Sequence, residues 1–162
     1  KVKAMKKLVL TLVMFVSLLG AAMASGGSTK SEKVNHRVET AFQKEFSGAT
    51  HVSWDHLKKE NIYEAKFIYN HERLHAYFDV DGNIIAIGRF VTESNLPLLL
   101  RKNIHERYDE YEVTEVVEYS TNNETSYLVV LENEKSKLVV QGYISGSTSV
   151  FKKEKKNSVA KL

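Results

Sequence analysis

Acidic and amide side chains gather in the stretch YFDVDGNIIA, residues 77–86, where oxygen ligands for a calcium ion could lie close together. An EF-hand loop needs ligands at its first, third and fifth positions, glycine at its sixth and glutamate at its twelfth. With Gly82 at the sixth position, the first position is Tyr77 and the twelfth is Gly88. Neither residue offers the required side-chain oxygen, so this stretch does not predict a calcium site.

A hairpin turn is the alternative interpretation of the same stretch. A two-residue type I′ turn needs a positive φ at both central residues, and Asp81-Gly82 is a common sequence for it. Such a turn pairs Phe78 with Ile85, which joins apolar residues on one face of the hairpin. We therefore predict a hairpin here.

The six histidines are the next candidates for chemistry, because a neutral imidazole binds metal ions and titrates near neutral pH. His71 and His75 are four residues apart, but we expect a turn between them and not the helix that a zinc-binding pair would need. His51 and His56 flank a short predicted strand, with Asp55 beside them. Since no set of four converging ligands follows from this spacing, we expect surface histidines, no metal ion and no cofactor.

Nucleophilic catalysis has no local signature in the chain. Cysteine is absent, which excludes a cysteine nucleophile, attached haem and thiolate metal ligands. No serine lies in a G-x-S-x-G elbow, and no glycine-rich loop precedes a helix as a phosphate site requires. The carboxylates of Asp109 and Glu110 fall at the end of a predicted helix, where a solvated surface explains them. We therefore predict that the protein is not an enzyme.

Two helices and eight strands are expected to position these side chains. Apolar residues at helical spacing predict a helix over residues 32–46, with Gly48 as its stop signal. A second helix is expected to begin at Ser94 or Asn95 as its cap, with Pro97 in its first turn. Alternating apolar residues predict strands at residues 51–57, 62–69, 73–80, 83–91, 112–120, 125–133, 137–145 and 148–153.

The two halves of the chain follow a similar plan at an offset of 62 to 64 residues. Phe42 aligns with Ile104, and the turn at 81–82 aligns with the turn at 145–146. This similarity predicts an α+β fold, a tandem repeat of one helix plus about four antiparallel strands. Both helices are expected on one face of a continuous antiparallel sheet. The predicted repeats are residues 32–93 and 94–151.

The sheet face opposite the helices is the strongest candidate for a binding site. Alternation places the following side chains on it: Glu64, Lys66, His75, Tyr77, Lys137, Val139, Gln141 and Tyr143. A twisted sheet is concave, and tyrosine is enriched at interfaces, so Tyr77 and Tyr143 are the expected anchors. Alternation places Ile68, Ile84 and Phe90 on the same face, where they would add apolar area. A polar, solvated face is the alternative.

Several segments resemble the PepSY-like family of exported bacterial proteins. They are AFQKEFSGATHVSWDH, YEAKFIYN, LHAYFDVDGNIIA and LPLLLRKNIHERYDEYEVTEVVEY, within residues 33–151. The resemblance implies the tandem-repeat fold of the β-lactamase-inhibitor protein, a periplasmic or secreted location and no catalytic motif. The second half departs from the pattern, because Val116 stands where the first half has Trp54 and its turn lacks Asp-Gly.

The first 24 residues have the parts of a secretory signal peptide. Lys6 and Lys7 precede an apolar run over residues 8–19, and Ala22-Met23-Ala24 supplies a cleavage site. We expect cleavage after Ala24, then a flexible linker at residues 25–31. An uncleaved anchor is the alternative, although the apolar run is shorter than the ~20 residues of a typical membrane span. The expected product is a periplasmic or secreted protein with no stable membrane insertion.

Removal of residues 1–24 changes the charge of the protein. The whole chain has 23 Lys and Arg against 20 Asp and Glu, and four of these lysines lie in the leader. The remaining 19 against 20 give a net charge of −1, which removes the main support for nucleic-acid binding. The remaining local excess of positive charge is the basic tail at residues 152–162.

These patterns predict an exported, non-enzymatic protein that binds or inhibits another envelope or secreted protein, or a peptide, through the open sheet face. The alternative is a periplasmic carrier of a small molecule or peptide, with its pocket between helices and sheet near Trp54. An envelope hydrolase has the least support. The sequence leaves the oligomeric state open.

Overall fold

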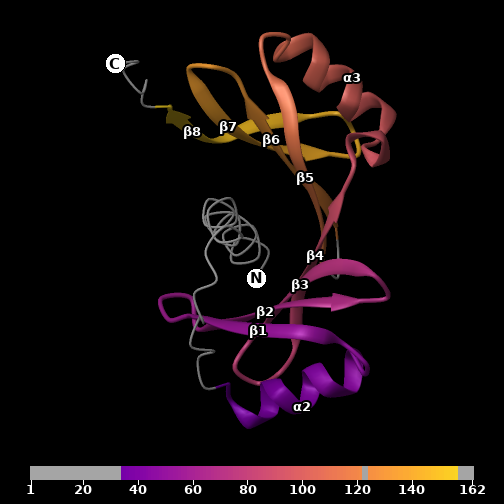
Figure 1. Ribbon diagram of the computed structural model, residues 1–162, viewed down its shortest axis with the longest axis vertical. Helices are drawn as coiled ribbons and strands as arrows, with labels where there is room; N and C mark the ends of the chain where they lie inside the picture. The colour runs from indigo at the N-terminus through magenta and orange to yellow at the C-terminus, as the bar shows by residue number, and fades with distance from the viewer. Residues whose placement is uncertain (1–33, 122–123, 157–162) are drawn as a thin grey trace.

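The computed structural model describes residues 34–121 and 124–156, which form one eight-stranded antiparallel sheet and two short α-helices (Figure 1). The predicted signal peptide at 1–24, the linker at 25–31 and the end of the basic tail lie outside the described residues. Over the ranges that are described, no helix is long and apolar enough to cross a membrane.

The first helix, α2 (His36–Glu45), is fixed by its cap and by its apolar spacing. The side chain of Asn35 accepts a hydrogen bond of 2.8 Å from the backbone N–H of Arg37, which satisfies a donor that the helix itself leaves free. Val38 and Phe42, four residues apart, are both buried. The helix therefore presents one apolar stripe to the sheet, as the sequence predicted.

The second helix, α3 (Leu98–Arg107), begins later than we expected. Ser94 and Asn95 do not cap it, because they belong to a separate 3₁₀ turn, η2 (Glu93–Asn95). Pro97 is the cap residue of α3, and no side chain caps this end. A proline restricts the residue before it to extended conformations, so a helix cannot run continuously from η2 into α3.

The eight strands follow one another across the sheet in the order of the chain. Each pairs antiparallel with its chain neighbours, so β1 and β8 are the edges. The strand positions expected from alternation are confirmed. The strands are β1 (Thr50–Leu57), β2 (Ile62–Tyr69), β3 (Glu72–Phe78), β4 (Ile84–Val91), β5 (Glu112–Thr121), β6 (Thr125–Glu132), β7 (Ser136–Tyr143) and β8 (Thr148–Lys155).

The predicted fold class, an α+β tandem repeat of one helix and about four strands, is wrong. The structure is mostly one sheet, and its two α-helices have only ten residues each. The backbone ladder also continues across the predicted boundary between 32–93 and 94–151, since β4 pairs with β5 from Ala86↔Thr121 to Val91↔Val116. The similarity of the two halves therefore does not divide the structure into separate helix-plus-strand units.

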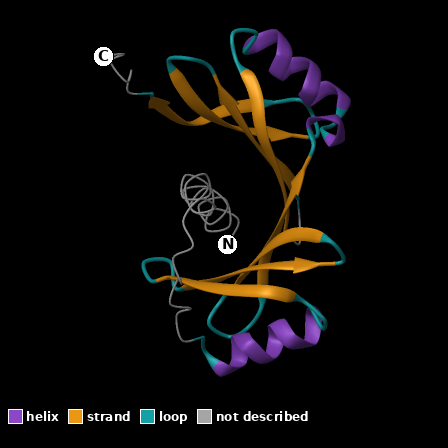
Figure 2. Cartoon of the chain, in the orientation of Figure 1, coloured by secondary structure: helices purple, strands orange, loops and turns teal. Residues whose placement is uncertain are grey.

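The sheet is strongly curved, and both helices lie on its convex side (Figure 2). Under α2, the buried cluster is Val38, Phe42, Phe46, Ala65, Phe67, Leu74, Ala76 and Phe78. Under α3, it is Leu96, Leu100, Ile104, Val116, Tyr127, Val129, Leu131, Leu138 and Val140. A third cluster belongs to the opposite face, namely Leu57, Ile62, Tyr77, Ala86, Val117, Tyr119, Leu128, Val130 and Val139.

The turn between β3 and β4 has three loop residues and not the expected two. The N–H of Asp79 donates to the carbonyl of Asn83, and the N–H of Gly82 donates to the carbonyl of Asp79. Gly82 has a φ of +89°, whereas Asp81 is not left-handed, which excludes a type I′ turn. The Asp79 carboxylate accepts hydrogen bonds from the backbone N–H groups of Asp81 and Asn83, so it closes the turn.

The longer turn changes the register only at the end of the hairpin, because Ala76 still pairs with Ile87, as a two-residue turn would also require. Phe78 pairs with Ile84 and not with Ile85, and a register irregularity separates this pair from Tyr77↔Ala86. Ile84 therefore packs against the cluster under α2, whereas Ile85 packs against the cluster of the opposite face. The expectation that Ile84 adds apolar area to the opposite face is wrong, because the bulge reverses its direction.

Substitution of Gly82 by alanine is expected to destabilise the protein more than substitution of Gly48. The two glycines have almost the same φ, +89° and +90°, so the backbone strain should be similar, about 1 kcal/mol or more for each variant. A Cβ at Gly82 would lie 2.9 Å from the backbone oxygen of Arg37, whereas nothing lies within 4 Å at Gly48. We expect this clash to add about 1–3 kcal/mol in Gly82→Ala. Urea unfolding of both variants measures the difference, and equal losses would mean that α2 moves aside freely.

Candidate binding site on the concave face

The concave face carries the alternate strand residues that point away from α2 and α3. All eight predicted site residues lie on it. Glu64 pairs with Tyr77 and Lys66 with His75 across β2 and β3. The other four, Lys137, Val139, Gln141 and Tyr143, lie along β7. Strands β4, β5 and β6 separate the two groups, so the eight residues share a face without forming one cluster.

Glu64 is the centre of a buried polar network on β2 and β3. His75 Nδ1 lies 2.8 Å from Glu64 Oε1, and the Tyr77 hydroxyl donates to the same oxygen at 2.9 Å. Lys66 Nζ is 3.5 Å from Glu64 Oε2 and 2.7 Å from Asp55 Oδ2. Because an ionised carboxylate can only accept, the His75 Nδ1 must carry the proton of this hydrogen bond. Glu64 is 3% exposed and His75 is 5% exposed, so the hydrogen bond between them is shielded from water.

The partners of Glu64 keep it charged despite its burial. Burial acts to raise the pKa of Glu64, but the hydrogen bond from His75 and the charge of Lys66 bring this pKa below its ordinary value of 4.5. Burial likewise acts to lower the pKa of Lys66, but the negative charges of Glu64 and Asp55 bring it above 10.5. At neutral pH the two side chains are therefore an ion pair on the concave face.

Tyr119 of β5 extends this network and was not among the predicted site residues. A Cβ at Gly88 would lie 2.8 Å from Tyr119 Cε1, so the absence of a side chain at Gly88 lets the ring cross β4. The Tyr119 hydroxyl consequently lies 3.4 Å from that of Tyr77. Burial raises the pKa of Tyr119 to about 12. The alternation in EVTEVVEYS was the sequence signal that could have placed Tyr119 on this face.

The predicted residues differ in how far they reach the surface. The buried ones are Glu64, His75, Tyr77, Val139 and Gln141, whereas Lys66, Lys137 and Tyr143 are half-buried. Tyr77, expected to be an anchor, is 1% exposed and uses its hydroxyl within the network. Phe90 is half-buried, and the guanidinium of Arg73 lies 4.4 Å from the centre of its ring. The concave face thus has a buried polar base and accessible aromatic and basic groups around it.

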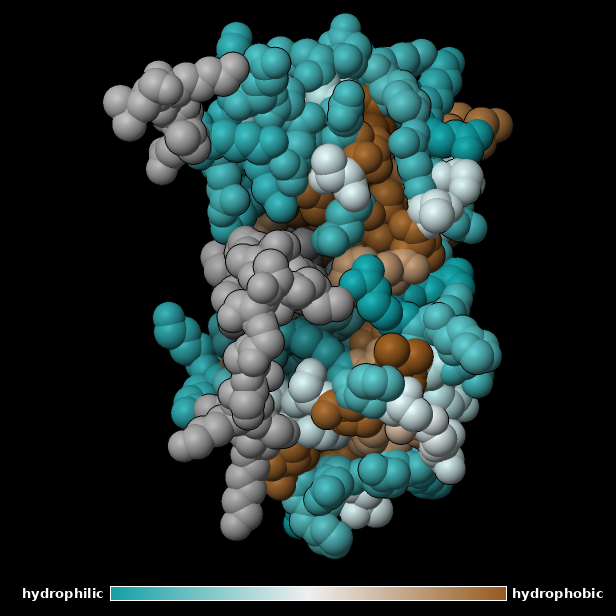
Figure 3. Space-filling view, viewed as in Figure 1, coloured by the Kyte–Doolittle hydropathy of each residue, from teal (hydrophilic) through white to brown (hydrophobic). Residues whose placement is uncertain are grey.

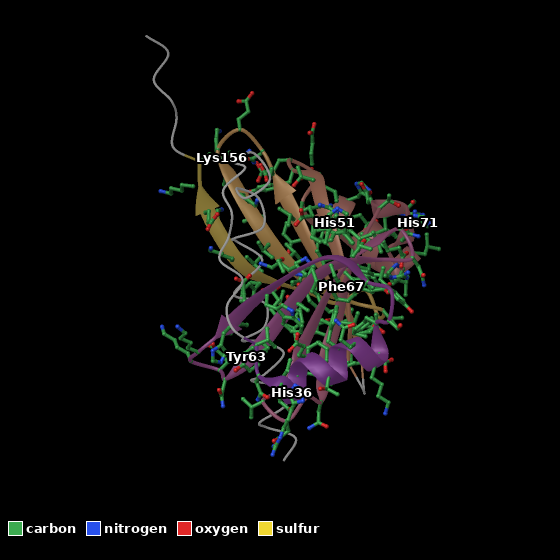
Figure 4. The ribbon with its side chains drawn as sticks, turned by 60° about the horizontal axis from the view of Figure 1, so that its bottom comes forward. His36, His51, Tyr63, Phe67, His71 and Lys156 are labelled. Carbon is green, nitrogen blue, oxygen red and sulfur yellow. The ribbon has the colours of Figure 1, made fainter. Side chains whose placement is uncertain are left out.

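The histidines occupy unrelated positions. His51 and His71 have left-handed φ values of 55° and 67°, and Figure 4 shows both of them apart from His36. His56 stacks on Tyr63, with ring centres 4.3 Å apart, and His75 belongs to the Glu64 network. Across residues 34–121 and 124–156, no group of three or more His, Cys, Asp or Glu side chains is arranged to hold a metal ion.

Trp54, near which a carrier would hold its ligand, packs into the cluster under α2. Its ring lies 5.1 Å from that of Phe42 in an edge-on arrangement and 6.0 Å from that of Phe78. Phe67 also packs edge-on against Phe42, at 4.9 Å. These rings occupy the space between α2 and the sheet.

No protein-family model matches the sequence, and no curated protein matches it. Among solved structures, the chain is similar to a DUF2874 family protein from Bacteroides uniformis, with 18% identity and a TM-score of 0.66 over 76% of this chain and 90% of that one. A candidate periplasmic protein from Bacteroides eggerthii has 14% identity and a TM-score of 0.66, over 76% of this chain and 89% of that one. A BLIP-like protein from Bacteroides fragilis has 20% identity and a TM-score of 0.60, over 80% of this chain and 93% of that one.

These similarities establish a BLIP-like fold, which the sequence resemblance had predicted. At such low identities they establish the fold alone, since one fold hosts many functions. Membership of the PepSY-like family stays a prediction.

Proposed function

We propose that the chain is an exported, non-enzymatic member of the PepSY-like family that binds another envelope or secreted protein through the concave face. The observation that carries the proposal is the group of accessible side chains Tyr143, Phe90 and Arg73, which lie on the face that neither described helix packs against. Apolar and aromatic side chains gathered on such a face are typical of a protein-binding surface.

The accessible groups of the concave face suit contact with a protein. Tyr143, Phe90 and Arg73 are aromatic or arginine side chains, the types that dominate the binding energy of interfaces. Lys66 and Lys137 can orient a partner by charge. The buried base formed by Glu64 and its partners holds β2 and β3 in a fixed arrangement, which lowers the entropic cost of binding. In this proposal Tyr77 supports the contact surface without being its anchor.

The alternative, a carrier with a pocket near Trp54, has less support. The rings of Trp54, Phe42 and Phe67 pack against one another where such a pocket would lie. Export is supported by the predicted signal peptide and by the similarity to a candidate periplasmic protein.

Site-specific cross-linking in the producing cell tests the proposal. The full chain carries a photoreactive phenylalanine analogue at Tyr143 or, as a control, at Lys44, which is exposed on α2. We expect a specific protein adduct from position 143 and none from position 44. In the chain labelled at 143, Phe90→Ala with Arg73→Ala should lower the adduct yield about tenfold or more, since each is a hot-spot residue type. Adducts of equal yield at both positions, or a yield unchanged by the double substitution, would contradict the proposal.

A further inference from the structure

The most exposed large apolar side chains of the described residues lie around the start of α3. Leu98 is 71% exposed, Leu99 57% and Ile144 60%. The turn that holds Ile144 lies against the helix, because Asn103 Nδ2 donates to the carbonyl of Gly146 at 2.8 Å and a Cβ at Gly146 would be 3.1 Å from Leu99 Cβ. We call Leu98, Leu99 and Ile144 the Leu98 patch. Figure 3 shows apolar atoms protruding beside α3, at the upper right of the molecule.

Basic side chains adjoin the Leu98 patch. Arg101 and Lys102 follow Leu98 by three and four residues, the spacing at which side chains are neighbours on a helix surface. The first turn of α3 has no acidic residue. The acidic residue Glu106 comes later in α3, with its carboxylate 3.6 Å from Lys102 Nζ.

We propose that the Leu98 patch docks the protein on an anionic phospholipid surface. Leu98, Leu99 and Ile144 would enter the boundary between headgroups and acyl chains, while Arg101 and Lys102 contact the phosphates. Peripheral binding needs both contributions, since neither a small apolar patch nor two charges hold a protein on a bilayer alone. Docking through the convex side leaves the concave face directed away from the lipid, so this inference does not depend on the proposed function.

A second copy of the chain is a less suitable occupant of this patch. A symmetric contact between two Leu98 patches would bring Arg101 and Lys102 of both copies close together, and like charges across an interface are repulsive. An anionic bilayer instead complements these charges. The carboxylates of Asp109 and Glu110, which follow the other end of α3, would remain in water.

A dye at a single introduced cysteine reports contact with lipid at a chosen position, because the chain has no cysteine of its own. The full-length variants Leu98→Cys and Val52→Cys are labelled with the environment-sensitive dye NBD. Val52 is an exposed apolar residue of β1 and serves as the control. Vesicles containing phosphatidylglycerol should shift the emission to the blue at position 98 and not at position 52. Vesicles of phosphatidylcholine alone should give a much weaker response.

The charge requirement is tested in the same assay. Adding Arg101→Glu and Lys102→Glu to the position-98 variant should raise the lipid concentration for half-maximal response about tenfold or more. High salt should have the same effect on the unsubstituted chain, so the test stands even if the charge reversal impairs folding. No response at position 98, equal responses at both positions or equal responses to both lipids would overturn the proposal. A response that grows with protein concentration without vesicles would identify a second copy as the occupant and overturn it too.

Discussion

Phe42→Ala is expected to lower the free energy of unfolding by about 3–5 kcal/mol, the range for removing a fully buried aromatic ring. Phe42 is 1% exposed, and its ring lies within 4.9–5.4 Å of the rings of Phe67, Trp54 and Phe46. Its removal leaves a cavity between rigid rings, which cannot collapse easily to fill it. Urea unfolding followed by the fluorescence of Trp54, the single tryptophan, measures the loss.

Two control variants separate packing from a general effect of substitution. Phe42→Leu keeps most of the buried volume and should cost much less than the alanine variant. Leu98→Ala removes an exposed side chain and should change the free energy of unfolding by about 0.5 kcal/mol or less. Similar losses in Phe42→Ala and Leu98→Ala would show that α2 is not packed on the sheet in solution.

Glu64→Gln is expected to cost about 2–3 kcal/mol at neutral pH, because it removes the buried charge that pairs with Lys66 and makes the hydrogen bonds of this side chain neutral and weaker. The substitution keeps the shape of the side chain, so cavity formation does not contribute. Lys66 would retain only Asp55 as an anionic partner, and the amide could meet the proton of His75 Nδ1 with its own N–H. Tyr77→Phe, which removes one hydrogen bond to Glu64, should cost less, about 1 kcal/mol.

The cost of Glu64→Gln should depend on pH in a defined direction. The pKa of Glu64 is lower in the folded protein than its ordinary value of 4.5, so the folded state favours the carboxylate. Its stabilisation is fully present above pH 4.5 and is lost as the pH falls through the lower, folded pKa. The difference between wild type and variant in urea unfolding should therefore shrink below pH 4.5. A difference that stays constant over that acidic range would contradict the ion pair.

Strand β2 was predictable because its alternate side chains lie in different surroundings on the two faces of the sheet. In β2, Ala65 and Phe67 pack under α2, whereas Glu64 and Lys66 lie on the concave face, and this produces the alternation seen in the sequence. The fold class was not predictable from the similarity of the two halves. That similarity does not show how small a part of the structure the two ten-residue helices form beside the eight paired strands.

The register error at Ile84 has a tertiary cause. Asp81-Gly82 is compatible with both a two-residue and a three-residue loop, so the local sequence does not choose between them. In the structure the turn packs against α2, with the Cα of Gly82 close to the backbone of Arg37. The three-residue loop is therefore accompanied by a contact between Gly82 and Arg37, which are 45 positions apart in the chain. The sequence around the turn gives no sign of this contact.

For the residues of the candidate site, the sequence predicted the face of the sheet on which they lie but not how deeply they are buried. The alternation of side chains along each strand alone placed Glu64, Tyr77 and Tyr143 on one face, and they lie on one face in the structure. The network between Tyr77 and Tyr119 depends on Gly88 lying opposite Tyr119. A helix and not a tight turn connects those strands, so their relative register could not be read from turn chemistry.

Among the described residues, the consecutive strand order makes β1 and β8 the edges of the sheet, and the outer backbone groups of an edge strand are potential templates for aggregation. The β1 edge is interrupted by an irregularity between Thr50 and Ser53, where His51 is left-handed. The β8 edge carries the lysines of the run KKEK, residues 152–155. A bulge and a row of lysines are two ways in which sheet proteins prevent strand addition by other molecules. The curved sheet can therefore present its concave face to a partner without adding strands of other molecules at its edges.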